Sequence, residues 1–425
     1  MEKNICIFED DKFSQLFPLV YCRPVFDLKC GILTLEERIK KYYSTASFHI
    51  QCRENLVSLQ KQKNKAISYN DLKELENNGC LFLNGKILID QEFVNNVNII
   101  GPDEIGICQE EVVYIRASSE LLKKIKNLWK IPLNTELVEK LKQIIKVKEI
   151  KVNLINYIWD TIKYNSEMLQ KDYEFLIGKG KIEGFIDPLA TIYGDKKNLY
   201  TAKNSRIEAG VVINLTSGPV YLDEDACIRP PSIIDGPCYI GKKTVIDGAK
   251  LRSGNSIGPV CKIAGELEES IILGYSNKHH DGFLGHAYLG EWVNLGAMTT
   301  NSDLKNNYGE IKIYVNGELI NTGEIKLGCF IGDHTKTGIG TLINTGSTFG
   351  VASNLFGGKE VLPKFVPSFS WGDGTSFVVH NTEKAISNAK KIMARRKVVL
   401  TDIEANILKE IFETTKEERK NLGIK

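Results

Sequence analysis

The sequence predicts an α/β domain, then a parallel β-helix, then a short helical segment at the end of the chain. Three changes along the 425 residues support this order. Up to about residue 175, apolar runs of strand length alternate with amphipathic helical stretches. From about residue 184, glycine is frequent and apolar residues recur every six positions. Beyond Gly374, glycine becomes rare and helical patterns return.

Residues 1–175 form the predicted α/β domain. Its strand-length apolar runs are NICIF and CLFLNGKILI. The stretches LTLEERIKKYY and ELLKKIKNLWK place apolar residues at helical spacing, with polar faces between them. A further amphipathic helix is expected from Thr135 to Lys151, packed against a sheet.

Residues 184–374 form the predicted β-helix. A six-residue period fits neither an α-helix nor a hairpin, but it fits a coil whose flat sides each present one inward residue. The ends of such a coil are unpaired, so it needs caps and usually neighbouring subunits. The recurrent positions are Ile228, Ile234 and Ile240, then Leu251, Ile257 and Ile263, then Ile325, Ile331, Thr337, Ile343, Phe349 and Leu355.

Two interruptions of the period and one helical tail complete the predicted architecture. The period is lost near residues 264–288 and again near 302–324, where a loop or hairpin is expected to leave the coil. Residues 381–425 are expected to form two helices, with Asn381 and Thr401 as their N-caps.

The bulk properties exclude several classes of function. The formal net charge of +2 disfavours a nucleic-acid partner. No window has the roughly 18 apolar residues of a membrane span, and the N-terminus lacks the pattern of a secretory signal. Ten dispersed cysteines without a C-x-x-C pair indicate reduced thiols, so a cytoplasmic location is expected.

Three of the six histidines lie close together in the stretch SNKHHDGFLGHAYLGEWVNLGAMTTN, residues 276–301. His279, His280 and His286 fall within eight residues. Such a cluster is compatible with a metal site, a catalytic base or packing.

An α/β domain followed by hexapeptide coils resembles the sugar-1-phosphate nucleotidyltransferases that carry a left-handed β-helix, whose bifunctional members also transfer an acetyl group. These proteins have an H-x-x-Y-L-G segment, then an I-G pair, then V-N-I-G-A-G-T. The stretches HDGFLG (280–285), LG (289–290) and VNLGAMT (293–299) are similar in spacing. The resemblance implies a left-handed β-helix and a transferase that modifies a sugar phosphate.

The same resemblance implies roles for three positions of this motif. His280 matches the catalytic base and Asn294 matches a sugar-contacting asparagine. An imidazole suits an amino sugar that loses a proton as its nitrogen attacks an acetyl thioester. Ala297 is an implied coenzyme A contact, and the backbone N–H groups of its turn would bind the developing oxyanion. Acetyl-CoA is therefore the expected donor substrate, and a sugar phosphate the acceptor.

Five further residues take implied binding roles. Arg252, in KLRSG, resembles the arginine that holds the sugar phosphate, and a guanidinium pairs well with phosphate oxygens. Lys278 and Phe283, the latter in place of a tyrosine, are implied to contact the substrate, and Asn301 and Lys305 the coenzyme A. A homotrimer is expected because hexapeptide coils in these transferases place their coenzyme A sites between subunits.

The N-terminal half is similar to a divergent nucleotidyltransferase signature. The stretch FEDDKFSQLFPLVYCRPVFDLKCGILTLEERI (8–39) keeps the family's Pro-Leu pair, has Arg-Pro for its Lys-Pro, and ends in its Glu-Arg-Ile. The implied nucleotide-binding candidates are Asp10, Asp11, Arg23, Asn84 and Gly85.

Two departures bear on the chemistry of this half. Glu9, Asp10 and Asp11 replace the glycines that wrap nucleotide phosphates, and their carboxylates would repel phosphate unless a cation intervened. The family's N-G-D, whose aspartate holds Mg²⁺, appears as Asn84-Gly85-Lys86, and a lysine cannot ligate magnesium. Mg²⁺ and a nucleoside triphosphate are expected partners only if one of the three carboxylates holds the metal.

Three interpretations of function stay open. The first is acyl transfer on the β-helix, with or without nucleotidyl transfer at the N-terminal domain. The second is a non-catalytic trimeric scaffold or sugar-nucleotide-binding regulator. The third is a zinc enzyme like the γ-class carbonic anhydrases, with His280, His286 and His334 as ligands, although the histidine spacing departs from that family's. Under the first interpretation no metal ligands are expected among these residues, and His279 and His286 only line the cleft.

Overall fold

The computed structural model describes residues 3–357 and 361–425. The chain divides into two compact units. The first comprises Met1–Leu16, Cys22–Leu28 and Leu33–Tyr157, and the second comprises Phe17–Tyr21, Lys29–Ile32 and Ile158–Lys425. The helix α6 (Asp160–Leu176) therefore belongs to the second unit.

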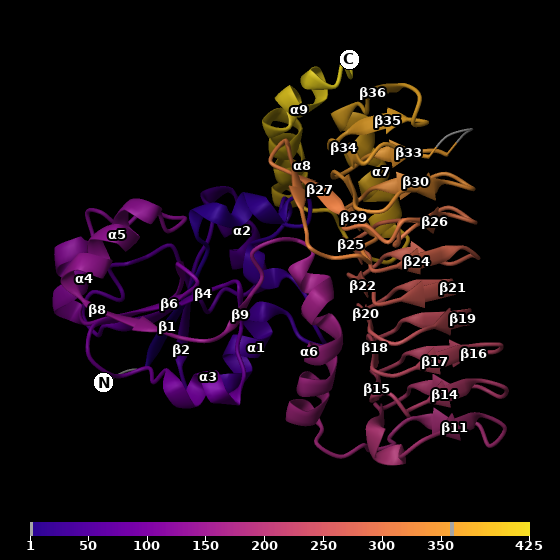
Figure 1. Cartoon of the computed structure of the whole chain (residues 1–425), viewed down its shortest axis with the longest axis horizontal. Coiled ribbons are helices and arrows are strands. Elements are labelled where there is room, and N and C mark those ends of the chain that lie inside the picture. Colours follow the sequence, from indigo (N-terminus) through magenta and orange to yellow (C-terminus); the bar gives the residue numbers. More distant parts are fainter. Residues whose placement is uncertain (1–2, 358–360) are drawn as a thin grey trace. The chain divides into compact units, whose positions relative to one another are not determined.

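The first unit is built on a mixed seven-stranded sheet with the order β3-β2-β1-β4-β7-β6-β8 (Figure 1). The strands β1, β2, β3 and β4 run parallel, whereas β7 is antiparallel to both β4 and β6. The bounds are β1 (Asn4–Phe8), β2 (Ser47–Gln51), β3 (Ser68–Tyr69), β4 (Cys80–Asn84), β6 (Glu104–Cys108), β7 (Glu111–Ala117) and β8 (Lys146–Glu149), with β5 (Ile87–Leu88) paired to β9 (Asn153–Leu154).

The three helices expected in the first unit are present, although α4 ends at Ile125, before the end of the stretch ELLKKIKNLWK, and α2 and α3 were not predicted. A capping box between Thr34 and Glu37 fixes the start of α1. The helix expected from Thr135 to Lys151 ends at Ile144, because residues 146–149 pair in parallel with β6 as an edge strand. The bounds are α1 (Leu35–Tyr42), α2 (Glu54–Lys63), α3 (Gln91–Asn96), α4 (Ser119–Ile125) and α5 (Thr135–Ile144), with short 3₁₀ helices at Asp11–Leu16 and Val25–Asp27.

The second unit contains a coil of short parallel strands stacked on one another (Figure 1). One face is the ladder β12-β15-β18-β20-β22-β25-β29-β32-β34, and strands of other sheets form the remaining faces. The predicted left-handed parallel β-helix is confirmed. The bounds of the long ladder are β12 (Leu199–Thr201), β15 (Val220–Leu222), β18 (Cys238–Ile240), β20 (Asn255–Ile257), β22 (Ile271–Ile272), β25 (Tyr288–Leu289), β29 (Cys329–Ile331), β32 (Ser347–Phe349) and β34 (Phe365–Val366).

The remaining strands complete the other faces. Those of the second large sheet are β10 (Phe185–Ile186), β11 (Thr191–Tyr193), β13 (Arg206–Ile207), β14 (Val212–Asn214), β16 (Cys227–Arg229), β17 (Ile233–Asp235), β19 (Val245–Leu251), β21 (Lys262–Glu268), β23 (Asn277–Lys278) and β24 (Phe283–Gly285). The later coils contribute β26 (Thr300–Asn301), β31 (Leu342–Ile343), β30 (Lys336–Thr337), β33 (Asn354–Leu355), β35 (Ser370–Gly372) and β36 (Phe377–Val379). A 3₁₀ helix covers Lys196–Asn198.

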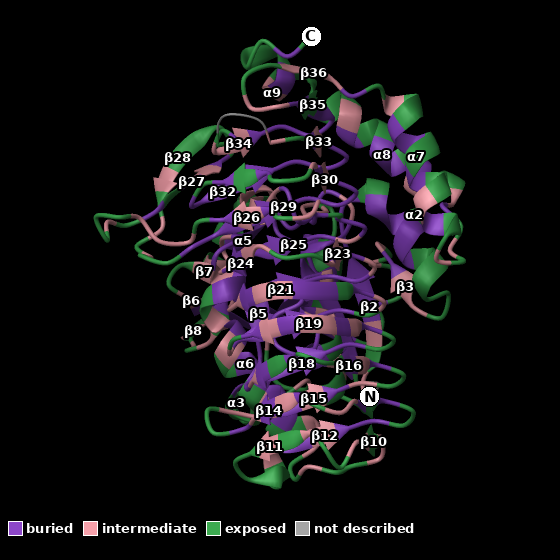
Figure 2. Ribbon diagram, turned by 90° about the vertical axis from the view of Figure 1, so that its right-hand side faces the viewer, coloured by how far each residue is buried: buried purple, intermediate pink, exposed green. Residues whose placement is uncertain are grey.

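The interior of the coil is a continuous apolar core, which Figure 2 shows as buried inner strands with exposed turns. The six-residue period located it correctly, since the first six recurrent positions are all fully buried. Ile325 is the exception in the third run, because it lies outside the coil with half of its side chain exposed.

The two predicted interruptions have different outcomes. Residues 302–324 leave the coil as expected and include the antiparallel hairpin β27 (Lys312–Val315) and β28 (Glu318–Asn321). The interruption expected at residues 264–288 is wrong, since β21, β22, β23 and β24 continue the ladders there. The apolar period is lost because the interior residues Ile263, Leu267 and Ile272 lie four and five positions apart, and because Lys278 takes the interior position that pairs with Ile263.

Helices follow the last coil. Asn381 and Thr401 cap α7 (Thr382–Ala394) and α8 (Asp402–Thr414) as predicted, and a further helix, α9 (Lys416–Asn421), completes the segment. Within residues 3–357 and 361–425, every helix is too short or too polar to cross a bilayer.

Candidate functional site

The turn between β23 and β24 presents His280 on the outside of the coil. The His280 side chain is exposed, and its ring centroid lies 5.4 Å from that of His279. His279 in turn directs Nε2 toward the Asp247 carboxylate, 3.4 Å away, on a neighbouring coil. The backbone of the turn is fixed because the Asp281 carbonyl accepts a hydrogen bond from the Met298 N–H at 2.9 Å. The His280 imidazole is therefore accessible from outside the coil.

Lys278, two residues earlier, points into the coil. Only 1% of it is exposed, and its Nζ donates hydrogen bonds to the carbonyls of His280 and Ala264. The structure thus places Lys278 beneath the His280 turn and not on the surface where a phosphate would bind.

A groove of about 460 Å³ runs along the coil face beside this turn. Phe283 lines it together with Asp281 and Gly282 of the turn. Glu266 of β21 pairs with Phe283 of β24, the adjacent strand of the next coil. The groove therefore extends over successive coils. Its other lining residues are Pro231, Ile233, Gly248, Ala249, Lys250, Gly265 and Glu266.

Two cations share one carboxylate at this face. Arg252 Nε lies 3.0 Å and Lys250 Nζ 3.5 Å from Glu266 Oε1. The hydrogen bond from Arg252 lowers the pKa of Glu266 below its usual range. Glu266 and Asp281 both line the groove, so these two cations face two carboxylates, and a phosphate would have to compete with Glu266 for them. The phosphate-binding role of Arg252 stays a prediction, and no sequence motif marks Lys250 beside it.

Asn294 and Ala297 lie on the next coil. Asn294 is exposed and pairs with Asn277, so it is level with β23 and not with His280. Its Oδ1 accepts a hydrogen bond from Asn277 Nδ2 at 3.2 Å. Ala297 is half-buried and precedes Met298, whose φ of 62° marks the turn.

The other two residues expected to contact coenzyme A, Asn301 and Lys305, lie in different environments. Asn301 is inside the coil, 2% exposed, and its amide both accepts from Gly285 N–H at 2.8 Å and donates to Gly285 C=O at 2.9 Å. Lys305 lies in the segment that leaves the coil, where its Nζ donates to the Glu310 carbonyl. The Asn301 side-chain amide thus makes with Gly285 the pair of hydrogen bonds that a neighbouring strand would make.

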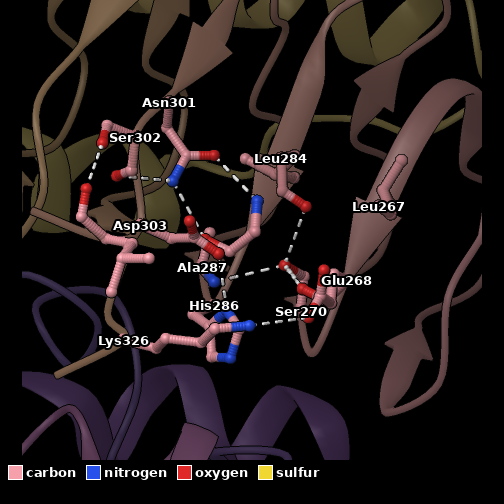
Figure 3. Close-up of polar contacts among 12 residues, drawn as sticks. Leu267, Glu268, Ser270, Leu284, His286, Ala287, Asn301, Ser302, Asp303 and Lys326 are labelled. Atoms are coloured by element: carbon pink, nitrogen blue, oxygen red, sulfur yellow. Dashed lines mark hydrogen bonds and ion pairs between the residues drawn. The ribbon is translucent and has the colours of Figure 1, made fainter. Parts of the chain in front are cut away.

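His286 belongs to a separate cluster at the next turn (Figure 3). Its Nδ1 lies 2.8 Å from Asp303 Oδ2, and Figure 3 shows the ion pair of Lys326 with Glu268, 3.3 Å long, close by. The His286–Asp303 contact was missed because it depends on where the chain leaves the coil.

The three histidines of the zinc hypothesis lie at three different turns. His280 follows β23, His286 follows β24, and His334 lies between β29 and β30, with its ring parallel to that of Trp292. Within residues 3–357 and 361–425, no three His, Cys, Asp or Glu side chains gather in a way that could hold a metal ion.

In the first unit, the candidate nucleotide residues gather where the parallel strands β1 and β4 end. Phe8 pairs with Asn84, so Asp10 and Asn84 meet at the carboxyl edge. Asp10 Oδ2 lies 2.7 Å from Lys86 Nζ and accepts a hydrogen bond from Asn84 Nδ2 at 2.9 Å. Gly85 is required here, since a Cβ would lie 2.8 Å from the Phe26 ring.

The neighbouring carboxylates are also engaged. Glu9 is fully buried, and it accepts hydrogen bonds from the Arg53 guanidinium at 3.1 and 3.2 Å and from Val25 N–H at 2.9 Å. Asp11 accepts from the Thr135 hydroxyl at 3.1 Å. Arg23 is 5% exposed, and its carbonyl accepts from Arg53 at 2.8 Å.

This donor set does not fit a magnesium ion. Lys86 is fully buried. Its Nζ lies 2.7 Å from Oδ2 of Asp10, the carboxylate oxygen that also accepts the hydrogen bond from Asn84. Magnesium requires several hard oxygen ligands in an octahedron, which a lysine cannot supply. A divalent cation at Asp10 would have to displace this internal cation.

Known proteins resemble parts of the chain. Residues 5–180 match the family described as sugar nucleotidyl transferase. A bifunctional sugar-1-phosphate nucleotidylyltransferase/acetyltransferase from Sulfurisphaera tokodaii is 35% identical over 177 residues, which are 39% of this chain. The chain spans only 41% of the length of that relative. The predicted resemblance to sugar-1-phosphate nucleotidyltransferases is confirmed by these matches.

Solved structures also resemble parts of the chain. The match to a protein described as a glucose-1-phosphate thymidylyltransferase from Bacillus anthracis covers 40% of this chain and 96% of that protein's chain, at 13% identity and a TM-score of 0.28. A UDP-N-acetylglucosamine acyltransferase covers 52% and 82%, at 16% identity and a TM-score of 0.22. The Arabidopsis UDP-N-acetylglucosamine acyltransferase covers 51% and 79%, at 13% identity and a TM-score of 0.21.

Proposed function

We propose that the β-helix transfers an acetyl group from acetyl-CoA to the amino group of an amino-sugar phosphate, with His280 as the general base. The observation that carries this proposal is the exposed His280 turn beside a groove lined by Lys250 and Glu266, with Arg252 paired to Glu266. The bifunctional relative from Sulfurisphaera tokodaii, whose name includes acetyltransferase, supports the reaction class.

The proposed reaction needs one base and one donor for a developing negative charge. The sugar amine attacks the thioester carbonyl, its proton passes to the His280 imidazole, and the C–S bond breaks. The departing thiolate takes up that proton and leaves as coenzyme A, so the products are an N-acetyl sugar phosphate and a thiol. Backbone N–H groups at the Ala297 turn are proposed to stabilise the oxyanion.

The sugar phosphate is proposed to lie along the groove. Phe283 offers an apolar surface for the ring, while Arg252 and Lys250 offer charge to the phosphate. A homotrimer in the cytoplasm is proposed as the working form, since coils of this class complete their donor sites between subunits. The cysteines agree with a reducing compartment, because they form no disulfide among the described residues.

The first unit is proposed to retain sugar-nucleotide recognition without magnesium. The match of residues 5–180 supports the fold of a nucleotidyl transferase, whereas the Asp10–Lys86 pair opposes a metal-bound triphosphate. Because the Asp10 carboxylate would repel a highly anionic ligand, a ligand less anionic than a triphosphate is favoured here.

The test is release of free thiol from acetyl-CoA with a panel of amino-sugar phosphates. His280→Asn is expected to lower kcat by about 10²- to 10⁴-fold, the usual contribution of a general base. His279→Asn is the matched control, since it changes the adjacent exposed imidazole, and it should retain kcat within about threefold. Equal activity of wild type and His280→Asn would show that the base is elsewhere. Absence of turnover with every acceptor would favour the regulator or scaffold interpretation.

A further inference from the structure

We propose that Lys278 is a positioning residue for the acyl transfer, because its ammonium inside the coil holds the backbone from which His280 projects. This inference rests on the proposed function of His280. It assigns to Lys278 a role that acts through another residue and not through contact with the substrate.

Lys278 occupies a position that neighbouring coils fill with aliphatic side chains. It pairs with Ile263 of the preceding coil, and the pairing of Asn277 with Asn294 makes it level with Leu295 of the next. Ile263 and Leu295 are both buried in the apolar core. A leucine or isoleucine at position 278 would therefore fit the stack.

An ammonium in this position costs folding free energy relative to an apolar side chain. Burial lowers the pKa of Lys278 to about 8, and the nearby Asp281 carboxylate only partly opposes the shift. Core packing therefore does not account for a lysine here. The hydrogen bonds that it makes are the remaining explanation.

The hydrogen bonds of Lys278 are directed at the turn that carries His280. Its Nζ donates to the carbonyl of His280 itself and to that of Ala264, 3.5 Å away. Gly265 makes room for this contact, because a Cβ there would lie 2.9 Å from Lys278 Nζ and 3.0 Å from the His280 oxygen. The ammonium thus fixes the His280 peptide from inside.

The opposite side of the turn is fixed by the coils before and after it. Met298 N–H donates to Asp281 C=O, and Glu266 N–H donates to Gly282 C=O at 3.2 Å. The hydrogen bond from Lys278 therefore fixes the orientation of the His280 peptide, whereas the carbonyls of the following two residues bond to adjacent coils. Losing it would let the imidazole shift while the coil stays intact.

Displacement of a catalytic group by about 1 Å can lower a rate by about 10²-fold. Lys278→Leu is therefore expected to lower kcat by about 10- to 100-fold, with KM for the amino-sugar phosphate unchanged within about threefold. Lys278→Gln keeps an N–H donor and should recover part of kcat. Lys336→Met is the matched control, since Lys336 is a half-buried lysine that likewise donates to a histidine carbonyl, that of His334, at 2.8 Å.

The folded state of each variant is measured by thermal unfolding, and Lys278→Leu should be at least as stable as wild type. A folded Lys278→Leu with wild-type kcat would overturn the proposal. A Leu variant that fails to fold would also overturn it, because the lysine would then be needed for the coil itself. An equal loss in Lys336→Met would show a general effect of buried lysines and not positioning.

A second readout does not depend on turnover. Diethyl pyrocarbonate modifies accessible imidazoles, and peptide mapping gives the rate for His280 and His279 separately. Lys278→Leu should change the His280 rate by about threefold or more, while Lys336→Met leaves it unchanged. If wild type transfers no acetyl group, the proposed function fails, but this rate still tests the positioning. An unaltered His280 rate would overturn it.

Discussion

Removing the internal cation of the first unit should destabilise that unit strongly. Lys86 is fully buried, with Nζ 2.7 Å from Asp10 Oδ2 and 3.7 Å from Glu111 Oε2. Lys86→Met leaves the Asp10 carboxylate with the Asn84 amide but without its counter-ion. Breaking a buried pair in this way costs about 3–5 kcal/mol, and the retained amide favours the lower end.

The loss can be measured by urea unfolding with a probe specific to the first unit. Trp129 is 8% exposed and donates to Gln51, and the other three tryptophans, Trp159, Trp292 and Trp371, belong to the second unit. With those three changed to Phe, fluorescence reports the first unit alone. A loss of about 3 kcal/mol at an m-value of about 2 kcal/mol/M lowers the midpoint by about 1.5 M.

The matched control neutralises both charges. Asp10→Asn combined with Lys86→Met removes the unpaired carboxylate and should recover most of the lost stability. A loss below about 1 kcal/mol in Lys86→Met, or no recovery in the double variant, would refute the view that Lys86 is the counter-ion of Asp10. Lys86→Asp extends the test, since Mg²⁺ should raise its melting temperature while leaving that of wild type unchanged.

Two further predictions concern the second unit. Because the pKa of Lys278 is lowered to about 8, unfolded chains bind more protons than folded ones above that pH, so the stability of wild type relative to Lys278→Leu should rise between about pH 8 and about pH 10. Urea unfolding at several pH values measures this difference, and a constant difference would contradict it. Lys250→Ala should raise KM for the sugar phosphate about 5- to 50-fold with kcat retained, and the effect should shrink in high salt. Thiol-release kinetics measure it, and an unchanged KM would remove Lys250 from the phosphate site.

The repeat pattern allowed most of the coil to be predicted. Positions such as Ile228, Ile234 and Ile240 are interior because each flat side of the coil needs one apolar residue. The same rule failed where the interior residue is polar, as at Lys278. It also failed at Ile325, which has the right spacing but belongs to the chain that leaves the coil.

The candidate site was predictable where a local motif marks it. The exposed position of His280 follows from its place in a turn. The partners that define its surroundings come from other coils, as Asp247 does for His279. In the first unit, the lysine of Asn84-Gly85-Lys86 already argued against magnesium, but its pairing with Asp10 required two strands to meet.

The last strand of the coil has a consequence for self-association. β36 runs antiparallel to β35, and its Val379 N–H bonds to the Lys425 carbonyl at the end of the chain. Arg419 of α9 donates to the Ser368 carbonyl, so the tail engages one backbone donor, Val379 N–H, and one backbone acceptor, Ser368 C=O, at this end of the coil. An open filament requires two complementary ends. With this end occupied by its own tail, head-to-tail stacking of copies into fibres is blocked.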